Sequence, residues 1–183
     1  MAEKKETYSL TVAGLKRELT LCPVDEKLDI AAFIMFSDVE LTVRAAEELL
    51  KIAPEHDVLI TAESKGIPLA YEMSRQSGRR YLLARKSKKL YMKNTVEVTV
   101  RSITTDRLQQ LFLDEEDMRY LKGKRVLLVD DVISTGESIH ALEQLVGQAG
   151  GIVAGKACVL AEGAAAERKD ILFLAPLPLF FKD

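Results

Sequence analysis

The feature that most constrains the fold is a short apolar run that ends at two adjacent carboxylates. Residues 126–129 read Val-Leu-Leu-Val, and Asp130 and Asp131 follow directly. Apolar runs of this length are typical of strands that are buried on both faces of a parallel sheet. The chain then passes through a Ser-Thr-Gly loop at 134–136 into a helical pattern from about 137 to 148. This stretch therefore predicts a strand, a loop and a helix within an α/β fold.

The order of these residue types also predicts a ligand. Open α/β sheets bind ligands at the carboxyl ends of their strands, and a Gly-containing loop that enters a helix offers backbone N–H groups to a phosphate. The carboxylates suit a neighbouring polyol or a metal ion held between ligand and protein. A helix cap beside a solvated charge is the plainer alternative. The predicted phosphate-binding residues are Ile133, Ser134, Thr135, Gly136, Glu137 and Ser138.

A second strand–loop–helix unit precedes the first. Val58–Ala62 reads as a strand, and the helix after it has Pro68 near its first turn and ends at Gly78. Between them, Ser64, Lys65 and Gly66 are expected at the same sheet edge as the aspartates, where they would hold a second anionic group. Considered alone, a lysine at a helix start is more often solvated.

Four cations follow the next predicted strand, Tyr81–Ala84. They are Arg85, Lys86, Lys88 and Lys89. Such a run is most often a solvated face or a nucleic-acid contact. At the carboxyl end of a strand, positioned cations can instead stabilise negative charge that develops on a leaving group.

A different pattern separates the two units. Residues 95–100 and 107–113 alternate between apolar and polar side chains, and residues 102–106 have turn composition. They predict an antiparallel hairpin that projects from the sheet. An edge ribbon without a role is the plain alternative, but the adjacent basic run favours a mobile flap over the site.

Length and composition limit the other classes of protein. The 183 residues suffice for one domain, which we divide into an N-terminal hood-like segment of about 1–57, a core of about 58–183 and a flexible hairpin of about 86–113. Earlier in the chain, Ser37 and Glu40 have capping-box spacing before a helical pattern.

The charges of 26 basic and 28 acidic residues nearly balance, which argues against nucleic acid or a membrane surface as partner. Cys22 and Cys158 match no metal or redox spacing. The N-terminus lacks a signal-peptide pattern, and no apolar run approaches a membrane span. We therefore expect a cytoplasmic protein.

The Asp-Asp and Ser-Thr-Gly stretch resembles the motif with which type I phosphoribosyltransferases bind 5-phosphoribosyl-1-pyrophosphate (PRPP). The resemblance spans about residues 58–162. Within it, the Arg-Lys-x-x-Lys-Leu sequence at 85–90 is similar to the stretch that leads into the flexible loop of purine phosphoribosyltransferases. The resemblance is strongest for the adenine and xanthine enzymes and for the purine-operon repressor. It implies an α/β fold with a parallel, helix-flanked sheet, PRPP and a purine as ligands, Mg²⁺ as cofactor and a homodimer.

The resemblance also implies roles for individual residues. Asp130 and Asp131 would hold the ribose hydroxyls, contact Mg²⁺ through PRPP and act in catalysis together with Lys89. The pyrophosphate would be held by Ser64, Lys65, Gly66, Arg85 and Lys86.

The base is less well specified. Adenine enzymes often carry a Glu in the flexible loop, where an ungapped count from Arg85 places Ser102 and leaves Glu97 as the carboxylate of the first hairpin strand. The segment from Phe33 to Phe36 is apolar and has no side-chain amide to bind an oxo group, which favours adenine. Both phenylalanines also suit a core. Xanthine or hypoxanthine as substrate, and a PRPP-sensing regulator without activity, are the alternatives. The apolar tail 175–181 would cover either the base site or a subunit partner.

Overall fold

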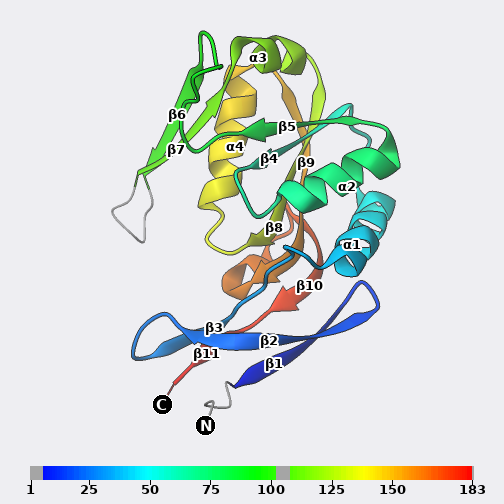
Figure 1. The fold of residues 1–183 in the computed structure, drawn as a ribbon, viewed down its shortest axis with the longest axis vertical. Helices are drawn as coiled ribbons and strands as arrows, with labels where there is room; N and C mark the ends of the chain where they lie inside the picture. The colour runs from blue at the N-terminus through cyan, green and yellow to red at the C-terminus, as the bar shows by residue number, and fades with distance from the viewer. Residues whose placement is uncertain (1–5, 102–107, 183) are drawn as a thin grey trace.

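The computed structural model describes residues 6–101 and 108–182. A parallel central sheet, an antiparallel N-terminal sheet and a separate hairpin make up its strands (Figure 1). In chain order the elements are β1 (Thr7–Val12), β2 (Leu15–Pro23), β3 (Leu28–Ala31), α1 (Val39–Ile52), β4 (Val58–Ala62), α2 (Ile67–Ser77), β5 (Arg80–Ala84), β6 (Val96–Arg101), β7 (Leu108–Leu113), α3 (Glu115–Leu121), β8 (Arg125–Ile133), α4 (Glu137–Gln148), β9 (Ile152–Glu162), a 3₁₀ turn (Gly163–Glu167), β10 (Leu172–Leu177) and β11 (Leu179–Phe181).

The central sheet has the order β10-β9-β8-β4-β5, and every neighbouring pair is parallel. This confirms the predicted helix-flanked parallel sheet. The strand β8 is longer than the apolar run that predicted it, because pairing with β9 continues through Asp130↔Cys158 to Ile133↔Ala161. Both aspartates therefore lie inside a hydrogen-bonded strand, which fixes their backbone.

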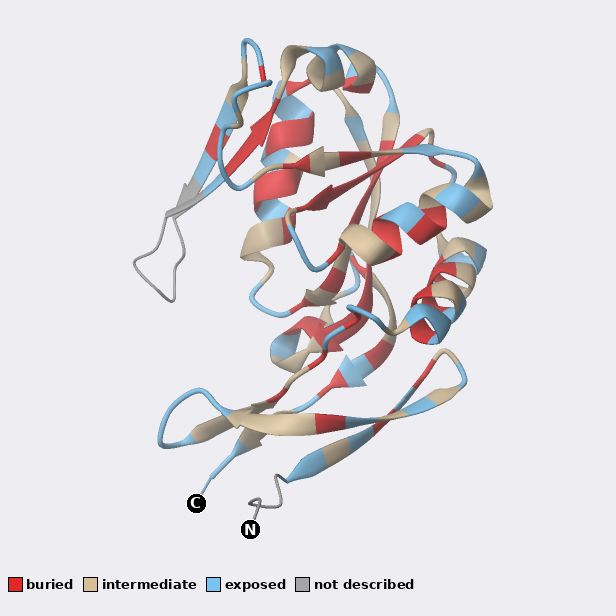
Figure 2. Cartoon of the chain, viewed as in Figure 1, coloured by how far each residue is buried: buried red, intermediate tan, exposed pale blue. Residues whose placement is uncertain are grey.

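Two hydrophobic cores lie on opposite faces of this sheet. Along β4, Val58 and Ile60 pack with α4 and the hairpin, whereas Leu59 packs with α1, α2 and the N-terminal sheet. All five residues of β4 are buried, as Figure 2 shows for most of the central strands. Alternation of side chains along a strand explains this division, and burial on both faces explains why the sequence of β4 is apolar throughout.

The N-terminal sheet has the order β1-β2-β3-β11, so the C-terminal tail completes it. Leu179 pairs with Ile30 and Phe180 with Asp29, both antiparallel. The rings of Tyr8 and Phe180 meet edge to face with centroids 5.2 Å apart. The two ends of the chain thus lie together at one end of the molecule (Figure 1). The tail thus pairs with the N-terminal sheet of its own chain, and its predicted role as a cover for the base site or a subunit partner stays a prediction.

The predicted capping box at the start of α1 is wrong by one residue. Asp38 is the N-cap, and its carboxylate accepts a hydrogen bond from the backbone N–H of Leu41 at 3.1 Å. Ser37 has φ of +69°, a left-handed conformation that directs it away from the cap position. Glu40 turns outward and pairs with Arg17.

The hairpin of β6 and β7 is confirmed, and its base is packed. Val98, Leu111 and Leu113 belong to the core beneath α4, and two backbone hydrogen bonds join Arg85 to Phe112 at 3.0 and 2.8 Å. The predicted turn at 102–106 lies outside the described residues. Closure of the hairpin over a ligand stays a prediction. Among the described residues, no helix combines the length and apolarity that crossing a membrane requires.

Candidate active site

A cavity of about 520 Å³ lies where the carboxyl ends of β4, β8 and β9 approach the N-terminal sheet. One wall is polar and one is apolar. The polar residues are Glu63, Ser64, Lys65, Lys86, Asp130, Asp131, Ser134, Ser138 and Glu162. The apolar wall contains Ile30, Ala31, Ala32, Phe33, Ile34, Phe36, Ala62, Val132 and Leu177. Residues predicted from three separate motifs are thus brought to one cavity.

The acidic pair, Asp130 and Asp131, forms part of the polar wall. Asp131 is buried, with 4% of its surface exposed, and its Oδ2 atom has no hydrogen-bond partner among the described residues. Oδ1 of Asp130 accepts the backbone N–H of Asp131 at 2.9 Å. A buried carboxylate oxygen without a partner is costly, so this atom is suited to a donor or cation that a ligand supplies.

The two carboxyl groups also disturb each other's ionisation. Burial and the neighbouring Asp131 raise the pKa of Asp130 to about 8. Burial likewise raises the pKa of Asp131. Lys86 opposes the shift at Asp130 and Lys65 opposes it at Asp131. Without a ligand the pair therefore retains a proton to higher pH than ordinary aspartates, and a bound cation or hydroxyl donor would favour its ionised form.

The predicted phosphate loop forms a cradle of about 80 Å³ beside the main cavity. It contains all six predicted residues, from Ile133 to Ser138. Gly136 has φ of +83° and starts α4 without a side-chain cap. A Cβ at this position would meet the Arg168 guanidinium. The helix start and its dipole make the cradle a site for an anion the size of a phosphate.

The second predicted anion loop packs directly on the acidic pair. Ser64 and Lys65 line the main cavity, and the peptide bond between Glu63 and Ser64 is cis. A Cβ on Gly66 would clash with Thr61 Oγ1 and lie 3.3 Å from Oδ1 of Asp130. Glycine is therefore required here for close approach of the loop to the carboxylates.

The basic run is divided among several environments. Lys86 lines the main cavity. The guanidinium of Arg85 lies 3.4 Å from the Glu63 carboxylate, whose other oxygen accepts the Lys86 N–H at 3.0 Å. Lys89 donates to Ser87 at 2.8 Å and lies outside the described lining of the cavity. Glu63, which sequence reasoning did not select, thus joins the two loops predicted to hold one anion.

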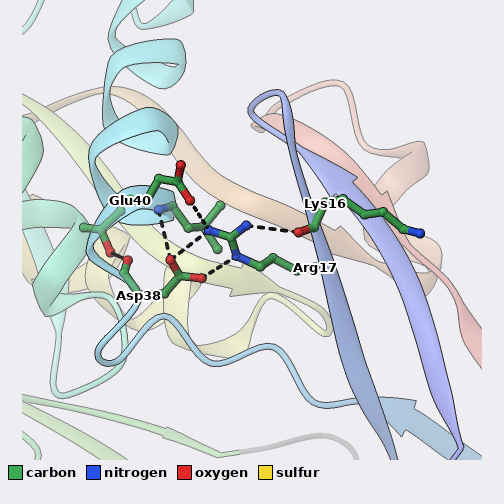
Figure 3. A network of polar contacts seen from close by, with 6 residues as sticks. Lys16, Arg17, Asp38 and Glu40 are labelled. Carbon is green, nitrogen blue, oxygen red and sulfur yellow. Dashed lines mark hydrogen bonds and ion pairs between the residues drawn. The ribbon is translucent and has the colours of Figure 1, made fainter.

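The segment between β3 and α1 contributes Ala32, Phe33, Ile34 and Phe36 to the apolar wall. Phe33 is buried in the core, whereas Phe36 is 48% exposed at the cavity. An ion-pair network fastens this segment to the N-terminal sheet (Figure 3). Arg17 donates to both oxygens of Asp38, at 2.7 and 3.0 Å, and to Glu40 at 2.9 Å. Because Asp38 also caps α1, one carboxylate connects the sheet, the segment and the helix.

Glu162 also lines the main cavity, and like Glu63 it was not predicted from the sequence as a site residue. It ends β9 and pairs in register with Leu177. Burial raises its pKa, while Lys65 and a hydrogen bond from Ser134 oppose that shift. The available signal was its position after a strand, the same signal that identified Asp130 and Asp131. Glu97 lies elsewhere, on the hairpin, where Thr99 and Gln110 donate to it.

The chemistry of the pair fits a ligand-borne magnesium ion. Among the described residues no group of three or more His, Cys, Asp or Glu side chains forms a metal site. Asp130 and Asp131 provide hard oxygen donors, and Mg²⁺ commonly uses one or two carboxylates together with substrate phosphates and water. The remaining ligands would have to come from the substrate.

The family model described as the phosphoribosyl transferase domain matches residues 37–175. The chain belongs to this family. Adenine phosphoribosyltransferase of Cenarchaeum symbiosum is 33% identical over 136 residues, which are 69% of this chain and 77% of that protein. A hypoxanthine/guanine phosphoribosyltransferase of Methanothermococcus okinawensis is 30% identical over 157 residues, 81% of this chain and 82% of that protein. The family predicted from the motifs is confirmed.

Solved structures agree with this fold. Adenine phosphoribosyltransferase of Thermoanaerobacter pseudethanolicus superposes with a TM-score of 0.71 at 21% identity, over 86% of this chain and 95% of that one. The Saccharomyces cerevisiae enzyme, complexed with adenine and an imino-altritol bisphosphate, gives 0.68 at 19% identity, over 86% of this chain and 92% of that one. The type I phosphoribosyltransferase fold is thereby confirmed.

Proposed function

We propose that this protein transfers the 5-phosphoribosyl group of PRPP to a purine base, preferably adenine, and releases pyrophosphate. The observation that carries the proposal is a cavity that places an acidic pair opposite an apolar wall, with the phosphate cradle directly beside it. Membership of the phosphoribosyltransferase family supports the same reaction.

The parts of the cavity match the parts of PRPP. The cradle around Gly136 binds the 5′-phosphate, and Asp130 and Asp131 accept hydrogen bonds from the ribose hydroxyls. Pyrophosphate binds at Ser64–Gly66. Lys86 adds positive charge there, with Arg85 held nearby by Glu63. Lys89 would join them when the hairpin closes.

The reaction breaks the bond between C1 of the ribose and the pyrophosphate oxygen. The bonding electrons leave with pyrophosphate, and Lys65, Lys86 and Arg85 stabilise the charge that develops on it. The ionised carboxylates of Asp130 and Asp131 stabilise the oxocarbenium character of the ribose. A purine ring nitrogen then forms the new bond to C1, and the proton that this nitrogen carried is released. Mg²⁺ bound to PRPP would neutralise part of the phosphate charge in this site.

Adenine is favoured because the wall formed by Phe33, Ile34, Phe36 and Leu177 has no side-chain amide to bind an oxo group. A site without such partners leaves the oxygen of an oxopurine unpaired. The relative from C. symbiosum is named for adenine, whereas that from M. okinawensis is named for hypoxanthine and guanine. The choice of base therefore needs its own measurement.

The proposed setting of the reaction is the cytoplasm, with the protein acting as a homodimer on small molecules alone. Two free cysteines, Cys22 and Cys158, suit a reducing compartment.

The proposal is tested by measuring pyrophosphate release from PRPP and Mg²⁺ with adenine, guanine, hypoxanthine and xanthine in parallel. We expect release that depends on the base and is fastest with adenine. A reaction without any base measures hydrolysis and is the control. Tight PRPP binding without turnover of any base would contradict the proposal and indicate a PRPP-sensing regulator.

A further inference from the structure

We propose that Glu162 determines base specificity by accepting a hydrogen bond from the exocyclic amino group of a 6-aminopurine. This inference rests on the proposed function, and it assigns a role to a carboxylate of the cavity that the mechanism above does not use. Its closest chemical counterparts, Asp130 and Asp131, are assigned to the ribose.

The position of Glu162 places it beside the apolar wall. It pairs in register with Leu177, which lines the same cavity. Two residues further along, Leu179 pairs with Ile30, another residue of that wall. The backbone after Glu162 turns at Gly163, where φ is +56° and an added Cβ would lie 2.9 Å from the Leu179 side chain. Glu162 therefore lies where the central sheet meets the N-terminal sheet.

The neighbours of Glu162 on its other side belong to the PRPP-binding loops. Ser134, the first polar residue of the phosphate cradle, hydrogen-bonds the carboxylate, and Lys65 attracts it. Glu162 thus lies between the phosphate cradle and the apolar wall. A base joined to the ribose would extend from the first toward the second, so its polar edge would come within reach of this carboxylate.

The selectivity follows from the hydrogen-bonding capacity of an ionised carboxylate, which only accepts. A 6-amino group presents N–H donors to it. A 6-oxo group presents lone pairs at the same place, and two facing acceptors repel. Burial of Glu162 strengthens both effects, because water competes less for the groups involved. The apolar wall leaves an oxo group unpaired but also gives the amino group no acceptor, so Glu162 would add to the preference that the wall provides.

The decisive variant is Glu162→Gln, because glutamine has the same shape and can donate as well as accept. We expect the ratio of kcat/KM for adenine to that for hypoxanthine to fall on the order of 10- to 100-fold, the effect of one charged hydrogen bond. The KM for PRPP should change much less. Glu167→Gln, an exposed carboxylate in the following turn, is the matched control and should leave the ratio unchanged. Glu162→Asp shortens the side chain and withdraws the carboxylate from the base. It should lower kcat/KM for adenine without raising kcat/KM for hypoxanthine.

Three results would overturn the inference. They are an unchanged ratio in Glu162→Gln, an equal loss with both bases accompanied by a raised KM for PRPP, and a wild-type preference for hypoxanthine. If the wild type turns over no purine, the proposed function fails separately. Calorimetric binding of adenine in the presence of PRPP and Mg²⁺ then decides: weaker binding by Glu162→Gln supports the inference, and equal binding contradicts it.

Discussion

The edge of the central sheet and the N-terminal sheet contribute opposite chemistry to one cavity. The central edge supplies carboxylates, two lysines and a helix start, each within a few residues of a strand end. The N-terminal sheet and the segment after it supply mainly apolar side chains, and the C-terminal strand β11 completes that sheet. Under the proposed function, the first region would bind the charged donor of the phosphoribosyl group and, through Glu162, the polar edge of the base, whereas the second would pack against the base.

The two regions also differ in how they are held together. Loops of the central edge are fixed by strand pairing on either side and by close packing of Gly66 on Asp130. The apolar wall is fixed by long-range contacts, among them the Arg17–Asp38 ion pair across 21 residues of sequence. Apart from Glu162, changes in the first region should therefore alter turnover and PRPP binding, and changes in the second should alter binding of the base.

The largest expected effect comes from the acidic pair. Asp130→Asn and Asp131→Asn keep the shape of the side chain but remove its charge, so each should lower kcat by about 10²-fold or more, as loss of a preorganised charge commonly does. The midpoint temperature of thermal unfolding should change little or rise, because desolvation raises the pKa of both carboxyl groups in the folded protein. Steady-state pyrophosphate release measures the effect, and normal turnover in both variants would remove the role assigned to the pair.

A smaller effect is expected at the phosphate cradle. Gly136→Val places a β-branched residue at φ of +83° and directs it at Arg168. We expect the KM for PRPP to rise by about tenfold or more, since the backbone of the cradle must shift. The control is Gly14→Ala, because Gly14 lies at a turn of the N-terminal sheet and an added Cβ there would have no atom within 4 Å. Gly147→Val is unsuitable as a control because it weakens α4. Wild-type affinity for PRPP in Gly136→Val would refute the placement of the phosphate.

The sequence predicted the central edge because its signals are local. The run before Asp130, the loop to Gly136 and the unit around Gly66 each lie within one strand–loop–helix stretch. The N-terminal sheet is assembled from distant strands, and its pairing of Leu179 with Ile30 has no local signature. The ends of β8, the cap at Asp38 and the contacts of Glu63 and Glu162 likewise depend on neighbours that are remote in sequence.

The two phenylalanines of the apolar wall separate stability from base binding. Phe33→Ala should lower the free energy of unfolding by about 3–5 kcal/mol, because Phe33 is buried in the core. Phe36→Ala should leave stability nearly unchanged and raise the KM for the base by up to about tenfold, the value of one aromatic contact. Thermal unfolding and steady-state kinetics distinguish the two, and equal effects on both quantities would contradict the distinction.

The network in Figure 3 allows a test of the second region from outside the cavity. Arg17→Met keeps the aliphatic stem but removes the ion pairs with Asp38 and Glu40. We expect the KM for the base to rise by roughly threefold, since ion pairs that remain partly open to solvent are weak, and the KM for PRPP to stay constant. Lys16→Met, which removes an exposed pair with Glu18, is the control. A change confined to PRPP would contradict the division between the regions.

The acidic pair also predicts a dependence on pH. Because the pKa of Asp130 is raised in the folded protein, the unfolded chain loses this proton at lower pH than the native one. Without ligand, stability should therefore fall as pH rises from about 4 to about 8. Binding of Mg²⁺-PRPP needs the ionised pair, so its affinity should increase modestly across the upper part of this range. Thermal unfolding of wild type and Asp130→Asn at several pH values measures the trend in stability, and calorimetric titration with Mg²⁺-PRPP measures the trend in affinity. If both proteins show the same dependence on pH, the two trends arise from groups other than Asp130.

Phosphoribosyl transfer to adenine is tested most directly by letting four purines compete for a limiting amount of PRPP. Adenine, guanine, hypoxanthine and xanthine are supplied together at equal concentration with Mg²⁺, and the nucleotide products are identified by mass spectrometry. Product amounts then report the ratios of kcat/KM. We predict that adenosine 5′-monophosphate predominates and that the nucleotides formed equal the pyrophosphate released. Predominance of another nucleotide would contradict the assignment of the base, and unchanged PRPP would contradict phosphoribosyl transfer itself.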